Sequence, residues 1–373
     1  MIIGIEAQRI FRKNKHGMDY VVLQEIKQLQ QLDTENEYYV FVKPGDDRCV
    51  DSTRNVHIVE VSCPSYPLWE QWALPRAARR CGVELLHCTS NTAPIWCDIP
   101  LVLTLHDIIF LEPRDKQNHS LYQNLGWLYR RLVVPRILDK CRRIITVSNF
   151  EKDNIVSKLH IPTERMAMIY NGYNEWFRPM GDVEATRSKY ISQDGYFFFL
   201  GNTDPKKNTE RTLVAYSKYL SQSAVKRPLL MADLDRNYLD SIIRRNGIEN
   251  IREHIVMPGY IVNSDLPAIY NAAFAFLYTS LRESFGIPLL EAMACGTPVI
   301  TSNTSSMPEI AGGDAILVNP ESSDDIAAMM LRLERDADFR HRQQALGPER
   351  ARLFSWRQTA QQLLEVYKAV GPT

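Results

Sequence analysis

Short apolar runs alternate with amphipathic segments along the first half of the chain. These runs predict strands at 2–7, 38–42, 56–61, 83–87, 101–105 and 144–147. After the first strand, a helix is predicted in which Val22, Ile26 and Leu29 share one face, and a Trp-rich helix is predicted over 69–80. Alternation of this kind is typical of an α/β domain, in which helices cover a parallel sheet.

The pattern is interrupted near Asn171 and Gly172, where further Gly and Pro residues follow. We expect a hinge between two domains over residues 172–192. Beyond it, strands are predicted at 196–200, 228–232, 254–257 and 274–278, and the last helix, 356–370, carries Leu363, Tyr367 and Val370 on one face. The predicted domains are 1–175, completed by the C-terminal helix 353–373, and 176–352.

Length and composition support two domains. A chain of 373 residues with 45% hydrophobic content can bury two cores, and a net charge of zero does not favour a nucleic-acid partner. The seven cysteines include no Cys-x-x-Cys pair, which favours a reducing compartment. Charge appears too early for a signal peptide, and no apolar run reaches the ~20 residues of a membrane span. We expect a cytoplasmic protein, with any membrane contact peripheral.

The stretch 280–301 combines two acids with the start of a helix. Pro288 predicts that a helix begins there, and Gly296 predicts its end. Glu283 is then expected on the incoming loop and Glu291 in the first turn, beside backbone N–H groups that suit a phosphate. Carboxylates in such a place can accept hydrogen bonds from ribose or sugar hydroxyls. The alternative is that both are ordinary solvated acids at a helix start.

A second candidate phosphate site follows the strand 196–200. Gly201 and Asn202 come directly after it, and Lys206 and Lys207 precede a helix expected from about Thr209. The first turn between strand and helix is a common phosphate position, but the Gly-x-Gly-x-x-Gly pattern of nicotinamide sites is absent. Alternatively, the lysines are solvated surface residues.

His106 and Asp107 end the strand 101–105, at the edge where open parallel sheets bind ligands. The pair either faces a ligand at this edge, or is structural, with Asp107 capping or orienting the histidine. Gly17, in a predicted loop, either approaches a ligand closely or only makes a turn.

Asp233 and Asp235 have the spacing of a metal motif. They follow a strand that is distant in sequence from the stretch 280–301, so no metal site is expected.

Residues 127–143 carry six basic residues among apolar ones. A basic amphipathic helix there is suited to an anionic membrane surface. The alternative is a helix with one face in the core and a solvated basic face.

The string ESFGIPLLEAMACGTPVI, starting at Glu283, resembles the signature of the family-4 retaining glycosyltransferases, in which two glutamates enclose seven residues. The resemblance implies the GT-B fold, in which two Rossmann-like domains face across a cleft and a C-terminal helix crosses back to the first. By this resemblance, Glu283 contacts the transferred sugar and Glu291 binds the ribose. The diphosphate would be held by Ser284, Phe285, Gly286 and Ile287.

The resemblance extends to most of the chain and assigns further roles. His106 would face the donor sugar, Lys207 would neutralise the diphosphate beside Lys206, and the backbone of Ile261 would border the base. Gly17 and Gly201 match glycines of the family's donor site. Two departures are visible: members often carry Gly-x-Gly where only Gly17 remains, and some carry arginine where this chain has Asn202, which would shift charge to Lys206 or alter donor preference.

The implied activity is retaining, metal-independent transfer of a sugar to an acceptor hydroxyl, with His106, Lys207 and Glu283 as the catalytic residues and no cofactor. The donor would be a GDP- or UDP-linked sugar, and similarity to bacterial surface-polysaccharide mannosyltransferases suggests mannose. The acceptor would be a saccharide or lipid-linked saccharide. Two other functions stay open: a sugar-nucleotide 2-epimerase of the same architecture, and a non-catalytic nucleotide-sugar-binding protein.

Overall fold

The computed structural model describes residues 1–13, 15, 17–112 and 121–371. Internal contacts divide the chain into two compact units, Met1–Gly172 with Trp356–Thr373, and Tyr173–Ser355. The first boundary falls at residue 172 where 175 was expected, and the second at 356 where 353 was expected. The last helix therefore belongs to the same unit as the first strand.

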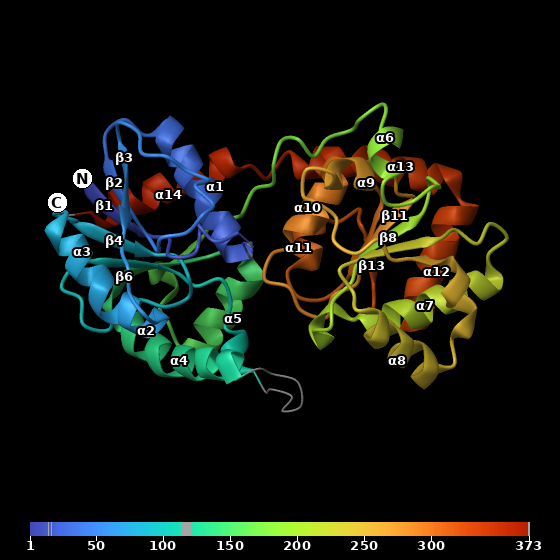
Figure 1. Ribbon diagram of the computed structural model, residues 1–373, viewed down its shortest axis with the longest axis horizontal. Helices are drawn as coiled ribbons and strands as arrows, with labels where there is room; N and C mark the ends of the chain where they lie inside the picture. Colours follow the sequence, from blue (N-terminus) through green and yellow to red (C-terminus); the bar gives the residue numbers. More distant parts are fainter. Residues whose placement is uncertain (14, 16, 113–120, 372–373) are drawn as a thin grey trace. The chain divides into compact units, whose positions relative to one another are not determined.

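The first unit is built on a parallel sheet of seven strands in the order β3-β2-β1-β4-β5-β6-β7 (Figure 1). The strands are β1 (Ile2–Glu6), β2 (Glu37–Val42), β3 (Val56–Glu60), β4 (Leu85–Cys88), β5 (Leu101–Thr104), β6 (Cys141–Thr146) and β7 (Met166–Met168). The sequence predicted all of them except β7, whose three residues are too few for a recognisable pattern.

Helices cover both faces of this sheet. They are α1 (Gly17–Leu32), α2 (Tyr66–Leu68), α3 (Leu74–Arg80), α4 (Leu121–Ile137), α5 (Asn149–Leu159) and α14 (Trp356–Val370), with a π-helical turn at Trp69–Ala73. Val40 and Val42 pack in the core shared with α1 and α14, whereas Phe41 between them packs in the core shared with α3, α4 and α5. Because successive side chains alternate between two buried faces, the strands appear in sequence as continuous apolar runs.

The C-terminal helix α14 is anchored in this unit by buried contacts. Leu363 and Tyr367 are almost fully buried, and the hydroxyl of Tyr367 lies 2.8 Å from Nδ1 of His87 on β4. Nε2 of His87 meets the Thr104 hydroxyl at 2.7 Å. Burial lowers the pKa of His87 to about 3, so its imidazole is neutral.

Two predictions about helix boundaries in this unit were wrong. Gly17 was expected in a loop, but it is the first residue of α1, where Asp19 in the first turn favours the helix start and pairs with Arg12. The basic helix expected over 127–143 ends at Ile137, and Cys141–Thr146 is strand β6. Pro135 in the last turn cannot donate a backbone hydrogen bond, and Ile144 and Ile145 pair with β5 instead.

The second unit is built on a six-stranded parallel sheet in the order β10-β9-β8-β11-β12-β13. Its strands are β8 (Phe197–Leu200), β9 (Leu229–Ala232), β10 (Ile255–Val256), β11 (Ala275–Tyr278), β12 (Val299–Ser302) and β13 (Ile316–Val318). Its helices are α6 (Glu184–Arg187), α7 (Thr209–Gln222), α8 (Arg236–Asn246), α9 (Leu266–Ala272), α10 (Ile287–Ala294), α11 (Met307–Ala311), α12 (Ser323–Arg335) and α13 (Ala337–Ala351).

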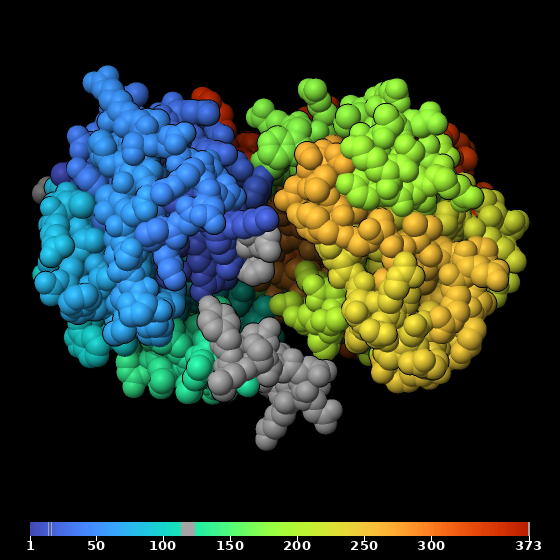
Figure 2. Space-filling view, viewed as in Figure 1, coloured from blue at the N-terminus to red at the C-terminus, as the bar shows by residue number. Residues whose placement is uncertain are grey.

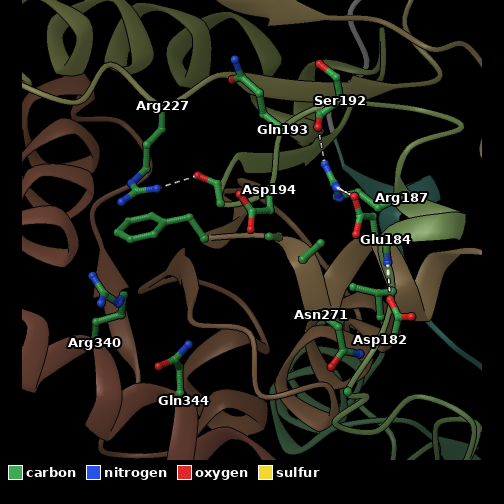
Figure 3. A pocket seen from close by; sticks show the side chains of 16 residues that line it. Asp182, Glu184, Arg187, Ser192, Gln193, Asp194, Arg227, Asn271, Arg340 and Gln344 are labelled. Atoms are coloured by element: carbon green, nitrogen blue, oxygen red, sulfur yellow. Dashed lines mark hydrogen bonds and ion pairs between the residues drawn. The ribbon is translucent and has the colours of Figure 1, made fainter.

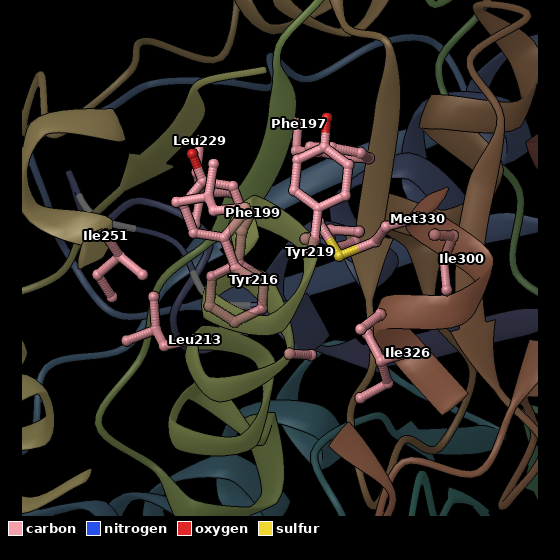
Figure 4. Close-up of a cluster of buried hydrophobic side chains, with 14 of the residues drawn as sticks. Phe197, Phe199, Leu213, Tyr216, Tyr219, Leu229, Ile251, Ile300, Ile326 and Met330 are labelled. Atoms are coloured by element: carbon pink, nitrogen blue, oxygen red, sulfur yellow. The ribbon is translucent and has the colours of Figure 1, made fainter. Parts of the chain in front are cut away.

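One face of this sheet carries the large apolar cluster drawn in Figure 4. Phe197 and Phe199 of β8 meet Tyr216 and Tyr219 of α7, and the Phe197 and Tyr219 rings pack edge to face with centroids 5.0 Å apart. The residue between them, Phe198, faces the other side, where its ring lies 5.3 Å from Tyr270 of α9. This packing on both faces fixes the ends of the strands from which the candidate site is built.

Candidate functional site

The candidate site lies where neighbouring strands of the second unit end. Strands β8, β11 and β12 are adjacent and parallel, so the loops after them meet at one edge of the sheet. Gly201 opens the first of these loops. A Cβ at Gly201 would lie 2.7 Å from Cβ of Leu234 and 2.8 Å from the carbonyl oxygen of Ala232, so the packing leaves room only for glycine.

Asn202 and Lys206 shape the loop after β8. The side-chain oxygen of Asn202 accepts a hydrogen bond from the N–H of Asp204 at 2.8 Å, and its carbonyl accepts one from the Thr209 hydroxyl at 2.6 Å. The ammonium of Lys206 lies 3.3 Å from the Asp204 carboxylate. Asn202 therefore builds the turn, and Lys206 already has a local counter-charge.

Lys207 and Glu283 are brought together from loops 76 residues apart. Nζ of Lys207 lies 2.6 Å from Oε1 of Glu283, with 28% and 13% of the two side chains exposed. The N–H of Leu281 donates to the carbonyl of Lys206 at 2.7 Å, which ties the two loops together at the backbone. The result is a partly exposed ammonium group held by a carboxylate, a charge-assisted pair in a fixed position.

The start of α10 adds hydrogen-bond donors to this edge. Gly286 has φ +104°, a backbone conformation that requires glycine. Within the described ranges, no acceptor meets the N–H of Gly286 or of Ile287. Donors at a helix start attract anions. Ser284 lies on the same loop, and the Phe285 ring is buried against Phe354.

Glu291 lies in the second turn of α10, not in the first as expected, because the helix begins at Ile287, one residue before Pro288. Burial raises the pKa of its carboxyl group to about 8. Across the described residues, this carboxyl has no hydrogen-bond partner. Glu291 is half-buried, and a carboxyl group without a partner among the described residues can bind a hydroxyl-bearing ligand.

The loop after β10 carries Ile261, whose side chain is buried with 3% exposed. Its backbone follows Gly259, whose carbonyl accepts from the N–H of Asp233 at 3.2 Å. Asp235 caps α8 by accepting from the N–H of Tyr238 at 2.9 Å, which is a structural role. The described residues contain no cluster of three His, Cys, Asp or Glu side chains that could hold a metal ion.

In the first unit, His106 follows β5 and is 6% exposed. The backbone N–H of His106 donates to the Asn91 side-chain oxygen at 2.6 Å, and the ring atom Nε2 lies 3.0 Å from the carbonyl oxygen of Thr89. Burial lowers the pKa of His106, so the ring is neutral at pH 7. The charge of Asp107 acts against burial and raises the pKa of the ring, and its carboxylate also accepts from the N–H of Ile109 at 3.0 Å, which closes a local turn.

Gly17, the other candidate in the first unit, meets no atom within 4 Å of an added Cβ. Space around this position therefore does not require glycine. The neighbouring His16 lies outside the described residues.

The sequence reasoning missed two features of this edge. Asn208, 3% exposed and with φ +59°, donates to the carbonyls of Thr279 at 3.0 Å and Pro320 at 2.7 Å, which joins three loops. The sequence feature that could have indicated this role is an asparagine directly before a helix, since asparagine tolerates the left-handed conformation. The second is a run of hydroxyl residues at 301–306, which bonds to the loop that carries Glu283.

A cavity of about 860 Å³ lies elsewhere in the second unit (Figure 3). It is lined by Gly195, Arg227 and Phe274, which precede β8, β9 and β11, so it lies at the opposite edge of the sheet. The Arg227 guanidinium stacks 3.8 Å from the centre of the Phe274 ring. This cavity is separate from the edge that holds Lys207 and Glu283.

Figure 2 shows the surface of the second unit in green to orange.

Two family models match successive parts of the chain. "Glycosyl transferases group 1" matches residues 183–350, and "Glycosyltransferase Family 4" matches residues 16–176. The O-antigen chain mannosyltransferase B of Escherichia coli is 31% identical over 279 residues, which make up 72% of this chain and 70% of that relative. The chain belongs to the group 1, family-4 glycosyltransferases. The expectation drawn from residues 283–300 is thereby confirmed.

This glycosyltransferase is also 26% identical to the O-antigen chain mannosyltransferase RfbU of Salmonella typhimurium, over 73% of its own length and 71% of RfbU. It is 27% identical to the serotype-specific mannosyltransferase WbdA of Escherichia coli over 70% of its length, but this match spans only 33% of WbdA. The chain thus corresponds to about a third of that relative.

Solved structures establish the fold of the glycosyltransferase as GT-B. Sucrose-phosphate synthase from Thermosynechococcus elongatus superposes with a TM-score of 0.77 at 19% identity, covering 99% of this chain and 98% of the other. HepE of Anabaena, solved with UDP and glucose, gives a TM-score of 0.70 at 18% identity, covering 99% and 100%. A glycosyltransferase takes a nucleotide-sugar donor and a saccharide acceptor. In its described portion, no helix has the length and apolar content needed to cross a membrane.

The pKa of Glu291 predicts a pH-dependent stability difference. Because the pKa is raised in the folded state from 4.5 to about 8, the folded protein loses stability relative to the unfolded chain as pH rises from 4.5 through 8. Glu291→Gln removes this loss. In thermal unfolding, the free energy of unfolding of the variant should rise relative to that of wild type between pH 6 and pH 8. The rise should be on the order of 1 kcal/mol after allowing for the partial exposure of Glu291.

The control is Glu321→Gln, which changes an exposed acid of the same unit. The difference in free energy of unfolding between this variant and wild type should stay constant over this pH range. A constant difference for Glu291→Gln as well would show that the Glu291 carboxyl is solvated and ionised, and that burial does not raise its pKa.

Proposed function

We propose that this glycosyltransferase moves mannose from GDP-mannose to a hydroxyl of a growing bacterial surface polysaccharide, with retention of configuration at the sugar. The Lys207 and Glu283 pair beside the start of α10 carries the proposal, because it sets a cation, two N–H donors and a carboxylate at one edge. The choice of mannose is supported by the O-antigen mannosyltransferases among the relatives.

The proposed division of labour follows from the charges. As the bond between sugar and phosphate breaks, negative charge grows on the leaving diphosphate. Lys207 and the N–H groups of Gly286 and Ile287 then stabilise that charge, as preorganised donors do. Glu283 holds sugar hydroxyls, and the carboxyl of Glu291, which has no hydrogen-bond partner in the described part of the chain, takes the ribose. In this proposal the protein's own positive groups replace a divalent cation, and no cofactor is needed.

The remaining candidate residues take supporting roles in the proposal. His106, neutral because of burial, faces the donor sugar, and Gly17 lies near the diphosphate. Ile261 borders the base through its backbone, and Lys206 adds charge beside Lys207. The leaving phosphate oxygen accepts the proton of the acceptor hydroxyl, so no side chain is assigned as general base. The acceptor is a saccharide or a lipid-linked saccharide.

The proposal is tested by assaying the intact chain with GDP-mannose, UDP-glucose and UDP-galactose, each with a mannose-terminated oligosaccharide and with or without EDTA. We expect α-linked transfer from GDP-mannose that EDTA does not stop. Lys207→Ala should lower turnover by about 100-fold, because one preorganised donor contributes on the order of 3 kcal/mol. Unfolding is measured in parallel, since Glu283 loses its counter-charge in this variant.

The matched control is Lys218→Ala, which removes a 2.6 Å ion pair with Asp324 elsewhere in the same unit. It should leave turnover unchanged. Equal turnover in the Lys207 and Lys218 variants would refute the role of Lys207. Conversion of the donor at its C2 without an acceptor would identify an epimerase, and donor binding without turnover would identify a binding protein.

We further propose that α4 makes peripheral contact with an anionic membrane surface. Leu125, Leu128 and Leu132 are 58%, 48% and 49% exposed, and their spacing places them on one face of the helix. Val133, Val134 and Ile137 on the other face are buried. The exposed Arg131 and Arg136 supply positive charge beside the leucines. Such an arrangement suits the headgroup region of a membrane.

Co-sedimentation with vesicles tests this contact. The protein should bind vesicles containing phosphatidylglycerol and bind neutral phosphatidylcholine vesicles much less, because the arginines need anionic lipid. Replacing Leu128 and Leu132 by Glu should abolish binding. Leu353→Glu, at an equally exposed leucine of the second unit, should have no effect. Wild-type binding by the double variant would exclude α4 as the contact.

A further inference from the structure

A run of hydroxyl side chains after β12 holds the loop that carries Glu283. Strands β11 and β12 pair through Tyr278 and Thr301, and the two segments continue side by side beyond this pair. We call the five side chains the hydroxyl ladder: Thr301, Ser302, Thr304, Ser305 and Ser306. Thr301 donates to the carbonyl of Tyr278 at 2.9 Å, Ser302 to that of Ser280 at 2.6 Å, and Thr304 to that of Leu281 at 3.4 Å.

The last two members hold Glu283 from both sides. The Ser305 hydroxyl oxygen accepts from the N–H of Glu283 at 3.2 Å. The Ser306 hydroxyl lies 2.9 Å from the carbonyl of Glu283 and 3.2 Å from that of Phe285. Both peptide groups of Glu283 are therefore bound by neighbouring side chains, while its carboxylate meets Lys207. Backbone groups outside a strand need such partners when they are removed from water.

Ser305 adopts a backbone conformation that serine rarely takes. Its φ is +56°, in the left-handed region that is unfavourable for residues with a side chain and readily adopted by glycine. Glycine would make this turn more easily, but it has no hydroxyl for Glu283. Strain of this kind is typical of functional sites, where the surrounding structure holds it in place.

We propose that Ser305 and Ser306 are positioning residues for glycosyl transfer, which fix Glu283 so that its carboxylate is aimed at the transferred sugar. This inference rests on the role proposed for Glu283. Ser305 bonds to the N–H of Glu283, whereas Ser306 also bonds to the peptide group that carries the N–H of Gly286. Removing the Ser305 hydroxyl therefore acts on the sugar end of the donor and leaves the diphosphate donors in place.

Ser305→Gly separates this role from folding stability, because glycine adopts φ +56° without strain and removes only the hydroxyl. The melting temperature should equal or exceed that of wild type. Turnover with the donor that wild type uses should fall at least tenfold, because small displacements of a positioning group lower rates strongly. The dissociation constant for the nucleoside diphosphate alone should change by less than about twofold, since no diphosphate contact is altered.

Ser306→Ala should reduce turnover in the same way and also lower the melting temperature, because it removes a buried hydroxyl that lies within hydrogen-bond distance of the Glu283 and Phe285 carbonyls. The matched control is Thr297→Val, which removes a buried hydroxyl bond to the Tyr270 carbonyl of 2.7 Å elsewhere in the unit. It should lower the melting temperature and leave turnover unchanged. Wild-type turnover in Ser305→Gly, or loss of diphosphate binding together with turnover, would overturn the proposal.

Hydrogen exchange of the donor-free protein tests the same inference without any assay of activity. The amide of Glu283 should exchange at least tenfold faster in Ser305→Gly than in wild type, because its acceptor is gone. In Thr297→Val the exchange of residues 280–286 should not change. Unchanged exchange at Glu283 in Ser305→Gly would overturn the ladder's role, whereas absence of sugar transfer by the wild type would count against the proposed function alone.

Discussion

The contact between Lys207 and Glu283 joins two loops that the fold must bring together before any donor chemistry is available. Each loop follows a strand, and the two strands, β8 and β11, are neighbours in one parallel sheet. Their relative position is set by packing on both faces, with Phe197 on one side and Phe198 on the other. A 2.6 Å pair of opposite charges survives half-buried only if both backbones are held rigidly, since ordering two long side chains is costly.

Rigidity at this edge comes from short polar side chains. Asn208 joins three loops, Asn202 closes the turn before Asp204, and the hydroxyl ladder bonds to the backbone on both sides of Glu283, from Tyr278 to Phe285. Glycine is needed at Gly201, where a Cβ would collide with neighbouring atoms, and at Gly286, where φ is +104°. The edge thus combines close approach of backbone with fixed polar groups, which is what binding of a diphosphate requires.

The architecture could be read from the sequence because apolar runs and helix periodicity are local signals. The start of α7 at Thr209 and the end of α10 near Gly296 follow from local signals, whereas the roles expected of Lys207 and of residues 284–287 came from the family resemblance. The predictions that were wrong concern features that depend on contacts between distant segments or on the exact residue at which a helix begins. The turn that holds Glu291 depends on a one-residue shift of the helix start, and the end of α4 depends on strand pairing. The ladder was missed because serine and threonine side chains have no pattern that reveals their acceptors.

A structure of the intact chain with GDP bound tests the central claim most directly. The account predicts that the phosphate oxygens accept hydrogen bonds from the N–H groups of Gly286 and Ile287 and lie within salt-bridge distance of Nζ of Lys207. The ribose hydroxyls should meet the carboxyl of Glu291. A diphosphate bound away from these groups, for example beside Arg227 and Arg340 in the cavity at the opposite edge of the sheet, would contradict it.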